Sequence, residues 1–201
     1  MKKLVRLSAI AALFLFSSLA ANAQIKVGIN GGVQLPMGKF SDYSKTGFGG
    51  GISGKYMLNP NMGVGLNVGF YSFDGKELGD GVLLSSKLKS TIIPITANYT
   101  YYFGEGTLKP YVGVDLGLSM VKAKSTVSAL GFSSSSDSTV TKFCFAPVVG
   151  AEYSLNENLA LDLNVKYNCI LDGAADIKST ESKTAMATTL GINLGLVYTI
   201  K

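Results

Sequence analysis

The sequence contains no histidine and no tryptophan, only two cysteines, and a single arginine at position 6. Without histidine the chain cannot form the Ser–His pair that activates a hydroxyl nucleophile, and it has no imidazole to bind a metal. Two cysteines cannot make a zinc site unaided. We therefore expect no enzymatic activity, no metal site and no bound cofactor.

Charged residues are also scarce, at 15% of the chain, whereas soluble surfaces carry about 25–35%. The chain has 18 basic and 13 acidic residues, and three of the basic ones lie in the first six positions. Beyond these, lysine alone supplies positive charge, and it forms no concentrated stripe of the kind that reads nucleic acid. We expect no nucleic-acid binding and expect part of the apolar surface to face lipid.

The longest hydrophobic run lies at the N-terminus. A basic start precedes an apolar run that ends at Leu19, and the small-residue pattern "ANA" ends at Ala23. This is the layout of a secretory signal peptide. We expect residues 1–23 to be removed on export and residues 24–201 to form one domain. No later segment reaches the roughly 18 uninterrupted apolar residues of a membrane helix.

The rest of the chain has a period of two. Apolar and polar residues alternate along eight segments, which is typical of β-strands with two unlike faces. Each segment is long enough for the roughly 9–11 tilted residues with which a strand crosses a bilayer. The segments are Gln24–Leu35, Gly47–Leu58, Gly63–Phe73, Lys89–Phe103, Lys109–Lys122, Thr139–Leu155, Leu159–Leu171 and Ala185–Lys201.

The connectors between these segments alternate between long and short. A soluble meander has no reason to sort its connectors in this way, whereas a membrane barrel has short periplasmic turns and long external loops. The sequence therefore predicts an all-β fold, an eight-stranded antiparallel up-and-down transmembrane β-barrel with periplasmic termini and four extracellular loops. The long connectors are residues 36–46, 74–88, 123–138 and 172–184, and the short ones are Asn59–Met62, Gly104–Leu108 and Asn156–Asn158.

The alternation assigns one face of each strand to lipid and the other to the barrel lumen. In Lys89–Phe103 the face with Ile93 and Ile95 is predicted to meet lipid, and the face with Asn98 the lumen. Pro94 has lumen parity and cannot donate a ladder hydrogen bond, so we expect a bulge there. A soluble lipocalin-like barrel would invert the faces, but it needs a charged exterior, and the polar face is mostly Gly, Ser, Thr and Asn.

The strand endings "IIPITANYTYYF" (residues 92–103) and "LGINLGLVYTIK" (residues 190–201), with the alternating connectors, resemble small eight-stranded outer-membrane barrels of the OmpA/OmpX type. The resemblance covers residues 24–201 and extends to the porin-like outer membrane beta-barrel domain common in Bacteroidetes. It implies an integral protein of the Gram-negative outer membrane that contacts outer-membrane lipid. It also implies insertion by the barrel assembly machinery and a monomeric state.

Six charged residues have lumen parity and lie in the half of each strand nearer the short turns or the N-terminus. Three lysines match three acids, which favours a salt-bridged plug in a lumen that side chains fill. A three-residue turn sets Glu152 opposite Asp162, and two facing carboxylates could instead act as acid and base. We expect removal of both charges to leave Lys55 and Lys166 unpaired. The six residues are Lys26, Lys55, Asp115, Glu152, Asp162 and Lys166.

Two further features have structural explanations. Gly49–Gly54, "GGGISG", matches G-x-G-x-x-G, but the strand and helix that dinucleotide binding requires are not indicated around it. We interpret these glycines as thinning a strand where space is tight. Cys144 has lumen parity and Cys169 lipid parity. Because a disulfide between opposite faces would need a bulge, we expect two free thiols.

The predicted external loops are small and polar, notably residues 130–139 and 173–186. They are either inert tips or binding surfaces for a ligand outside the cell. The expected function is therefore a structural or surface-interaction role. A narrow passive pore for small solutes and a soluble periplasmic carrier of an apolar ligand are the alternatives.

Overall fold

The protein is described by a computed structural model, and the description covers residues 24–75, 85–104, 106–129, 132–171 and 187–200. The predicted signal peptide, all of the last predicted loop (residues 172–184) and residues 76–84 of the predicted loop 74–88 lie outside these residues. No helix in the described ranges is long and apolar enough to cross a membrane.

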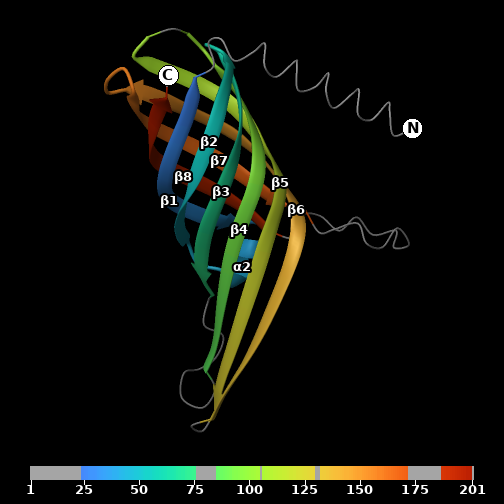
Figure 1. Cartoon of the computed structure of the whole chain (residues 1–201). Coiled ribbons are helices and arrows are strands. Elements are labelled where there is room, and N and C mark those ends of the chain that lie inside the picture. The colour runs from blue at the N-terminus through green and yellow to red at the C-terminus, as the bar shows by residue number, and fades with distance from the viewer. Residues whose placement is uncertain (1–23, 76–84, 105, 130–131, 172–186, 201) are drawn as a thin grey trace, which may run out of the picture.

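Eight antiparallel strands close into one barrel, in which each strand pairs with its neighbours in sequence and β1 pairs with β8 (Figure 1). This confirms the predicted all-β, eight-stranded up-and-down barrel. The strands are β1 (Ile25–Met37), β2 (Gly47–Asn59), β3 (Met62–Asp74), β4 (Ser85–Tyr102), β5 (Leu108–Ala129), β6 (Phe132–Ser154), β7 (Leu159–Ile170) and β8 (Ala187–Ile200), and a short helix α2 (Phe40–Tyr43) lies between β1 and β2.

The exterior of the barrel is apolar, whereas its lumen holds buried polar side chains together with smaller apolar clusters. Along β8, buried and exposed residues alternate, so that Asn193 is 1% exposed and its neighbour Leu194 is 53% exposed. Ile29 on β1 and Leu66 on β3 are also largely exposed. In water this would be costly, because burying such a side chain contributes about 1.5–3 kcal/mol. The arrangement is opposite to that of a soluble lipocalin-like carrier, and that alternative is wrong.

Pro94 does not cause a bulge, contrary to the prediction from its position. The register between β4 and β5 is the same on both sides of it. Between β3 and β4 the register is also the same at Val68↔Ile95 and at Tyr71↔Ile92, although the two intervening pairs are missing. The proline therefore interrupts the ladder, as the loss of its N–H dictates, without adding a residue to the strand.

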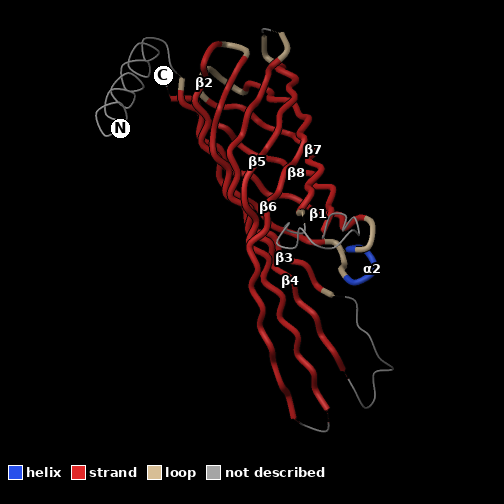
Figure 2. The backbone as a smooth tube through the Cα atoms, turned by 90° about the vertical axis from the view of Figure 1, so that its right-hand side faces the viewer, coloured by secondary structure: helices blue, strands red, loops and turns tan. Residues whose placement is uncertain are grey.

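β4, β5 and β6 continue beyond the rest of the barrel, at the end opposite the short turns (Figure 2). β5 runs to Ala129, β6 starts at Phe132, and the two stay paired throughout. Residues 123–138, predicted as a loop, are therefore mostly strand. The prediction is wrong because a polar composition indicates exposure to water, which a projecting strand shares with a loop. The name "extension" is used below for residues 85–89 of β4, 122–129 of β5 and 132–143 of β6.

The glycines of Gly49–Gly54 differ in the space around them. A Cβ on Gly49 would lie 2.0 Å from the carbonyl oxygen of Phe70 on the neighbouring strand. A Cβ on Gly54 would have no atom within 4 Å. The prediction that these glycines serve close packing of the strands is therefore confirmed at Gly49 and wrong at Gly54.

Gly49→Ala should lower the free energy of unfolding by about 1–3 kcal/mol, because the added methyl group forces the neighbouring backbone to shift. Gly54→Ala is the matched control and should change it by less than about 0.5 kcal/mol. Urea unfolding of both variants in lipid vesicles, followed by tyrosine fluorescence, measures the difference. Equal losses would mean that the close approach at Gly49 does not limit stability.

Candidate functional site

The six charged residues singled out by strand parity all line the lumen. They divide into a group around Glu152, near the short turns, and a group around Asp115, halfway along the barrel. Four of the six are buried, namely Lys26, Asp115, Glu152 and Asp162, while Lys55 and Lys166 are partly buried.

The group around Glu152 closes the end of the lumen nearest the short turns. Glu152 on β6 forms an ion pair with Lys26, which reaches it from β1 across the barrel. Its other oxygen accepts a hydrogen bond from the hydroxyl of Tyr102 on β4 at 2.5 Å. That hydroxyl in turn accepts one from Lys55 Nζ on β2 at 2.6 Å, and the same Nζ lies 3.9 Å from Glu152. One carboxylate therefore neutralises two lysines and ties four strands together.

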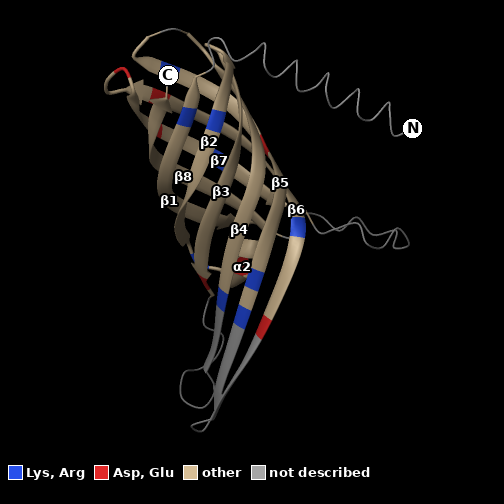
Figure 3. Cartoon of the chain, viewed as in Figure 1, with Lys and Arg blue, Asp and Glu red and all other residues tan. Residues whose placement is uncertain are grey.

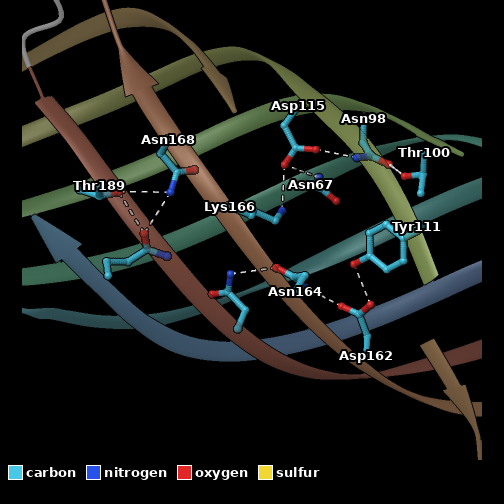
Figure 4. Close-up of polar contacts among 12 residues, drawn as sticks. Asn67, Asn98, Thr100, Tyr111, Asp115, Asp162, Asn164, Lys166, Asn168 and Thr189 are labelled. Carbon is cyan, nitrogen blue, oxygen red and sulfur yellow. Dashed lines mark hydrogen bonds and ion pairs between the residues drawn. The ribbon is translucent and has the colours of Figure 1, made fainter. Parts of the chain in front are cut away.

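Asp162 stands opposite Glu152 in the register of β6 and β7, as the short turn predicts. Its carboxylate is held by hydrogen bonds from neutral side chains and not by an ion pair with a lysine. The Tyr111 hydroxyl donates to Asp162 Oδ1 at 2.7 Å, and Asn164 Nδ2 donates to Asp162 Oδ2 at 2.6 Å (Figure 4). Asn193 Nδ2 then donates to Asn164 at 3.0 Å. This side of the lumen is a chain of neutral donors that ends on one carboxylate.

The group around Asp115 fills the middle of the lumen. Lys166 Nζ lies 2.8 Å from Asp115 Oδ2, which also accepts a hydrogen bond from Asn67 at 3.0 Å (Figure 4). Asn98 donates to Asp115 Oδ1 at 2.5 Å. The expectation that Lys166 depends on Asp162 or Glu152 is therefore wrong, because its partner comes from β5. Neutralising Glu152 would instead leave Lys26 and Lys55 without a carboxylate.

Both oxygens of each of these three carboxylates already accept hydrogen bonds from neighbouring side chains. A general acid or base needs a position directed at a substrate. The geometry therefore gives no support to Glu152 and Asp162 as a catalytic pair. In the described ranges, no group of three His, Cys, Asp or Glu side chains could hold a metal ion.

An apolar cluster fills the lumen at the end near the extension. Phe40 of α2 packs edge-on against Phe73, with ring centroids 5.4 Å apart. Between this cluster and the charged groups lies a cavity of about 50 Å³, which Gln34 and Ser119 help to line. Gln34 Nε2 and Ser119 Oγ are buried without a partner among the described residues. The buried members of the cluster are Phe73, Ile92, Cys144, Ile170 and Ala187.

The sequence prediction omits Tyr102, whose hydroxyl joins Lys55 to Glu152. Tyr102 has the same parity as Asn98, so the alternation alone could have placed it in the lumen. It also omits Asn67, which shares Asp115 with Asn98. Parity indicates which face of the strand a residue occupies, but it does not indicate which side chains of non-adjacent strands meet across the lumen.

Cys144 and Cys169 are both free and buried, as predicted for the thiols. Cys144 lies in the apolar cluster with Ile170. Cys169 is opposite Phe145 in the β6–β7 pairing. It has the predicted lipid parity, which it shares with the exposed Tyr167, yet it is only 7% exposed. The two side chains therefore occupy different surroundings although they lie on adjacent strands.

Aromatic side chains mark both ends of the exterior. Tyr153 and Tyr198 near the short turns, and Phe48 and Phe70 toward the other end, are between 49% and 64% exposed. A closed eight-stranded barrel with an apolar exterior, aromatic residues at its rims and a lumen filled by side chains, many of them polar, is a small transmembrane β-barrel. The chain belongs to the family of the outer membrane protein beta-barrel domain, whose model matches residues 8–199. Membership of this family implies location in the outer membrane.

Individual relatives are distant. An uncharacterized protein of Haemophilus influenzae is 26% identical over 161 residues, which cover 80% of this chain and 87% of that protein. A major outer membrane protein of Thermus thermophilus has a TM-score of 0.56 at 18% identity, over 89% of this chain and 99% of that one. The attachment invasion locus protein Ail of Yersinia pestis has a TM-score of 0.48 at 20% identity, over 89% and 97%. The similarity to the Thermus structure extends to the fold alone.

Proposed function

We propose that this protein is a non-enzymatic integral outer-membrane protein whose extension contacts polypeptides outside the cell. The proposal includes export by a signal peptide at residues 1–23 and insertion of residues 24–201 as a monomer by the barrel assembly machinery. One observation carries it, the open edge of β6 in the extension.

The edge of β6 is a row of backbone groups that has no strand beside it in the described part of the chain. β7 ends too early to pair with residues 132–142, which pair with β5 alone. Leu171 N–H donates to the carbonyl oxygen of Phe143 at 2.9 Å, so Phe143 faces away from β5. Because backbone groups alternate in direction along a strand, those of Ser133 and Ser135 face the same open side.

An open edge of this kind accepts an extended polypeptide as an additional strand, with main-chain hydrogen bonds supplying the affinity. Exposed edges also risk pairing with copies of themselves, and charged side chains on the edge strand reduce that risk. β6 carries Asp137 and Lys142 in this stretch. The edge is therefore suited to a foreign extended segment more than to a second identical edge.

Cells that display the protein should bind plates coated with reduced, alkylated serum albumin, an unfolded chain with many extended segments. Replacing residues 125–136 by an Asn-Gly turn should lower this binding about tenfold, because the turn closes the hairpin near the barrel rim. Plates coated with native albumin, which offers few free extended segments, are the control surface. A boiled-versus-unboiled gel shift checks that both proteins are folded in equal amounts.

A second variant separates the edge from the hairpin as a whole. Ser133→Pro combined with Ser135→Pro removes two N–H groups from the open edge of the segment that the shortened protein lacks, and it removes none from the ladder with β5. Binding should fall as in the shortened protein, whereas Ser133→Ala with Ser135→Ala should bind like the original. Full binding by either the proline variant or the shortened protein would rule out the edge as the contact.

A narrow passive pore is the second candidate function. The cavity between the apolar cluster and the charged groups favours it, because it leaves part of the lumen unfilled by side chains. The side chains packed at both ends of that cavity support a closed lumen instead. Conductance distinguishes the two and is taken up in the Discussion.

A further inference from the structure

Lysines gather on the outward face of the barrel wall where the extension begins. Lys89 on β4 and Lys122 and Lys124 on β5 are all exposed. Figure 3 shows this basic colouring on β4 and β5 at the base of the extension. All three have the parity of the exposed apolar residues, such as Ile95 on β4 and Leu118 on β5, and so point outward from the barrel.

The three lysines lie close together because of the register. Lys89 is directly opposite Lys124, and Lys122 is diagonal to Lys89 on the same face. Directly opposed side chains in an antiparallel pair have Cβ atoms about 4.5–5.5 Å apart, and like charges at that distance destabilise the sheet. An anion placed between them would relieve this repulsion. The arrangement therefore favours a bound negative charge.

Acidic residues flank the lysines without forming ion pairs with them in the described part of the chain, and two carboxylates leave three lysines with an excess of one positive charge. Asp74 on β3 is opposite Lys89, and Asp137 on β6 is opposite Lys124. Among these described side chains, neither Asp74 with Lys89 nor Asp137 with Lys124 forms an ion pair. Lys122 is opposite Thr91 on β4 and Thr139 on β6, so no acidic residue is directly beside it. The outward face at this level therefore keeps a net positive charge centred on β4 and β5.

The lysines stand at the edge of the apolar band. The outward residues of β5 from Pro110 to Met120 are all apolar, and Lys122 is the first charge beyond them. Ten residue steps of about 3.3 Å, tilted by about 40°, rise roughly 25 Å along the barrel axis. That distance matches the height of about 25 Å expected for the lipid-facing band. The lysines are therefore level with lipid headgroups and face them.

We propose that Lys89, Lys122 and Lys124 bind a phosphate-bearing lipid headgroup on the outer surface of the barrel. The position favours a lipid phosphate over inorganic phosphate, because lysines that face lipid at headgroup level lie next to lipid phosphates. Basic residues near an anionic membrane surface contribute about 1 kcal/mol each, which is about a fivefold change in affinity. This site is on the wall of β4 and β5 and is separate from the edge of β6.

The test uses the whole protein in detergent micelles that contain phosphatidic acid and phosphatidylcholine with the same acyl chains. Native mass spectrometry counts the retained molecules of each lipid. The protein should retain phosphatidic acid in preference to phosphatidylcholine. Each single substitution Lys89→Gln, Lys122→Gln or Lys124→Gln should weaken that preference about fivefold, and the triple variant should abolish it.

Two controls and one competitor complete the test. Lys39→Gln removes an exposed lysine from the connector before α2 and should leave the preference unchanged. Replacing all three lysines by arginine should retain it. Equal retention of the two lipids by the original protein, or the same preference in the triple glutamine variant, would overturn the proposal. Displacement of phosphatidic acid by inorganic phosphate at low millimolar concentration would overturn the assignment to a lipid.

Discussion

Glu152→Gln should lower the free energy of unfolding in lipid vesicles by about 3–5 kcal/mol. The carboxylate is the ion-pair partner of both Lys26 and Lys55, and it accepts the Tyr102 hydroxyl as well. An amide of the same shape keeps the packing and removes the negative charge. Two lysines then remain in the lumen without a counter-charge, which is the costly result of breaking a buried pair.

Urea unfolding followed by tyrosine fluorescence and by the boiled-versus-unboiled gel shift measures this loss. Asp42→Asn in α2 removes an exposed carboxylate and should change stability by less than about 0.5 kcal/mol. Adding Lys26→Met to Glu152→Gln should recover part of the loss, since it removes one of the two unpaired charges. A loss below about 1 kcal/mol for Glu152→Gln alone would contradict the description of this group as a buried ion pair.

The original protein should insert into a planar bilayer without discrete conductance steps, and opening it should require changes at both ends of the lumen. Tyr102 is 1% exposed within the charged group, and Phe73 is 1% exposed within the apolar cluster. Phe73→Ala combined with Tyr102→Ala removes one large ring from each end. Because the charged mid-lumen residues then line a wider path, stepwise currents should appear with this double variant.

The single variants are the matched controls, because each leaves one end of the lumen packed, and neither should conduct. A large truncation in a core costs about 3–5 kcal/mol, so the gel shift must show that the double variant is folded in the membrane. Tyr102→Leu with Phe73→Ala is the milder pair if it is not. Conductance steps from the original protein would place the passive pore ahead of the surface role.

The strand pattern was predictable because the two faces of each strand meet different surroundings. β2 is predicted at Gly47–Leu58 and found at Gly47–Asn59, since lipid outside and packed side chains inside impose a strict alternation. The alternation weakens where a strand leaves the membrane, because both faces then meet water. β5 is therefore predicted to end at Lys122, whereas it continues to Ala129.

The contacts in the lumen were predictable only in part. Parity places Lys166 inside the barrel, but its partner Asp115 lies on β5, two strands away from β7. Such a pairing depends on the curvature of the wall and on the reach of each side chain across the lumen. Neighbour relations such as that of Glu152 and Asp162 follow from turn length, and contacts across the barrel do not.

The ion pair between Lys26 and Glu152 also constrains the order of folding. The two residues are 126 positions apart in the chain, on the first and the sixth strands. A hairpin of neighbouring strands forms from local contacts, whereas this pair can form only when the sheet curls and the first strand approaches the sixth. Contacts of such long sequence separation slow folding, because loop closure must precede them. A partly assembled sheet would leave these charges unpaired, so the ring should close late and in one cooperative step.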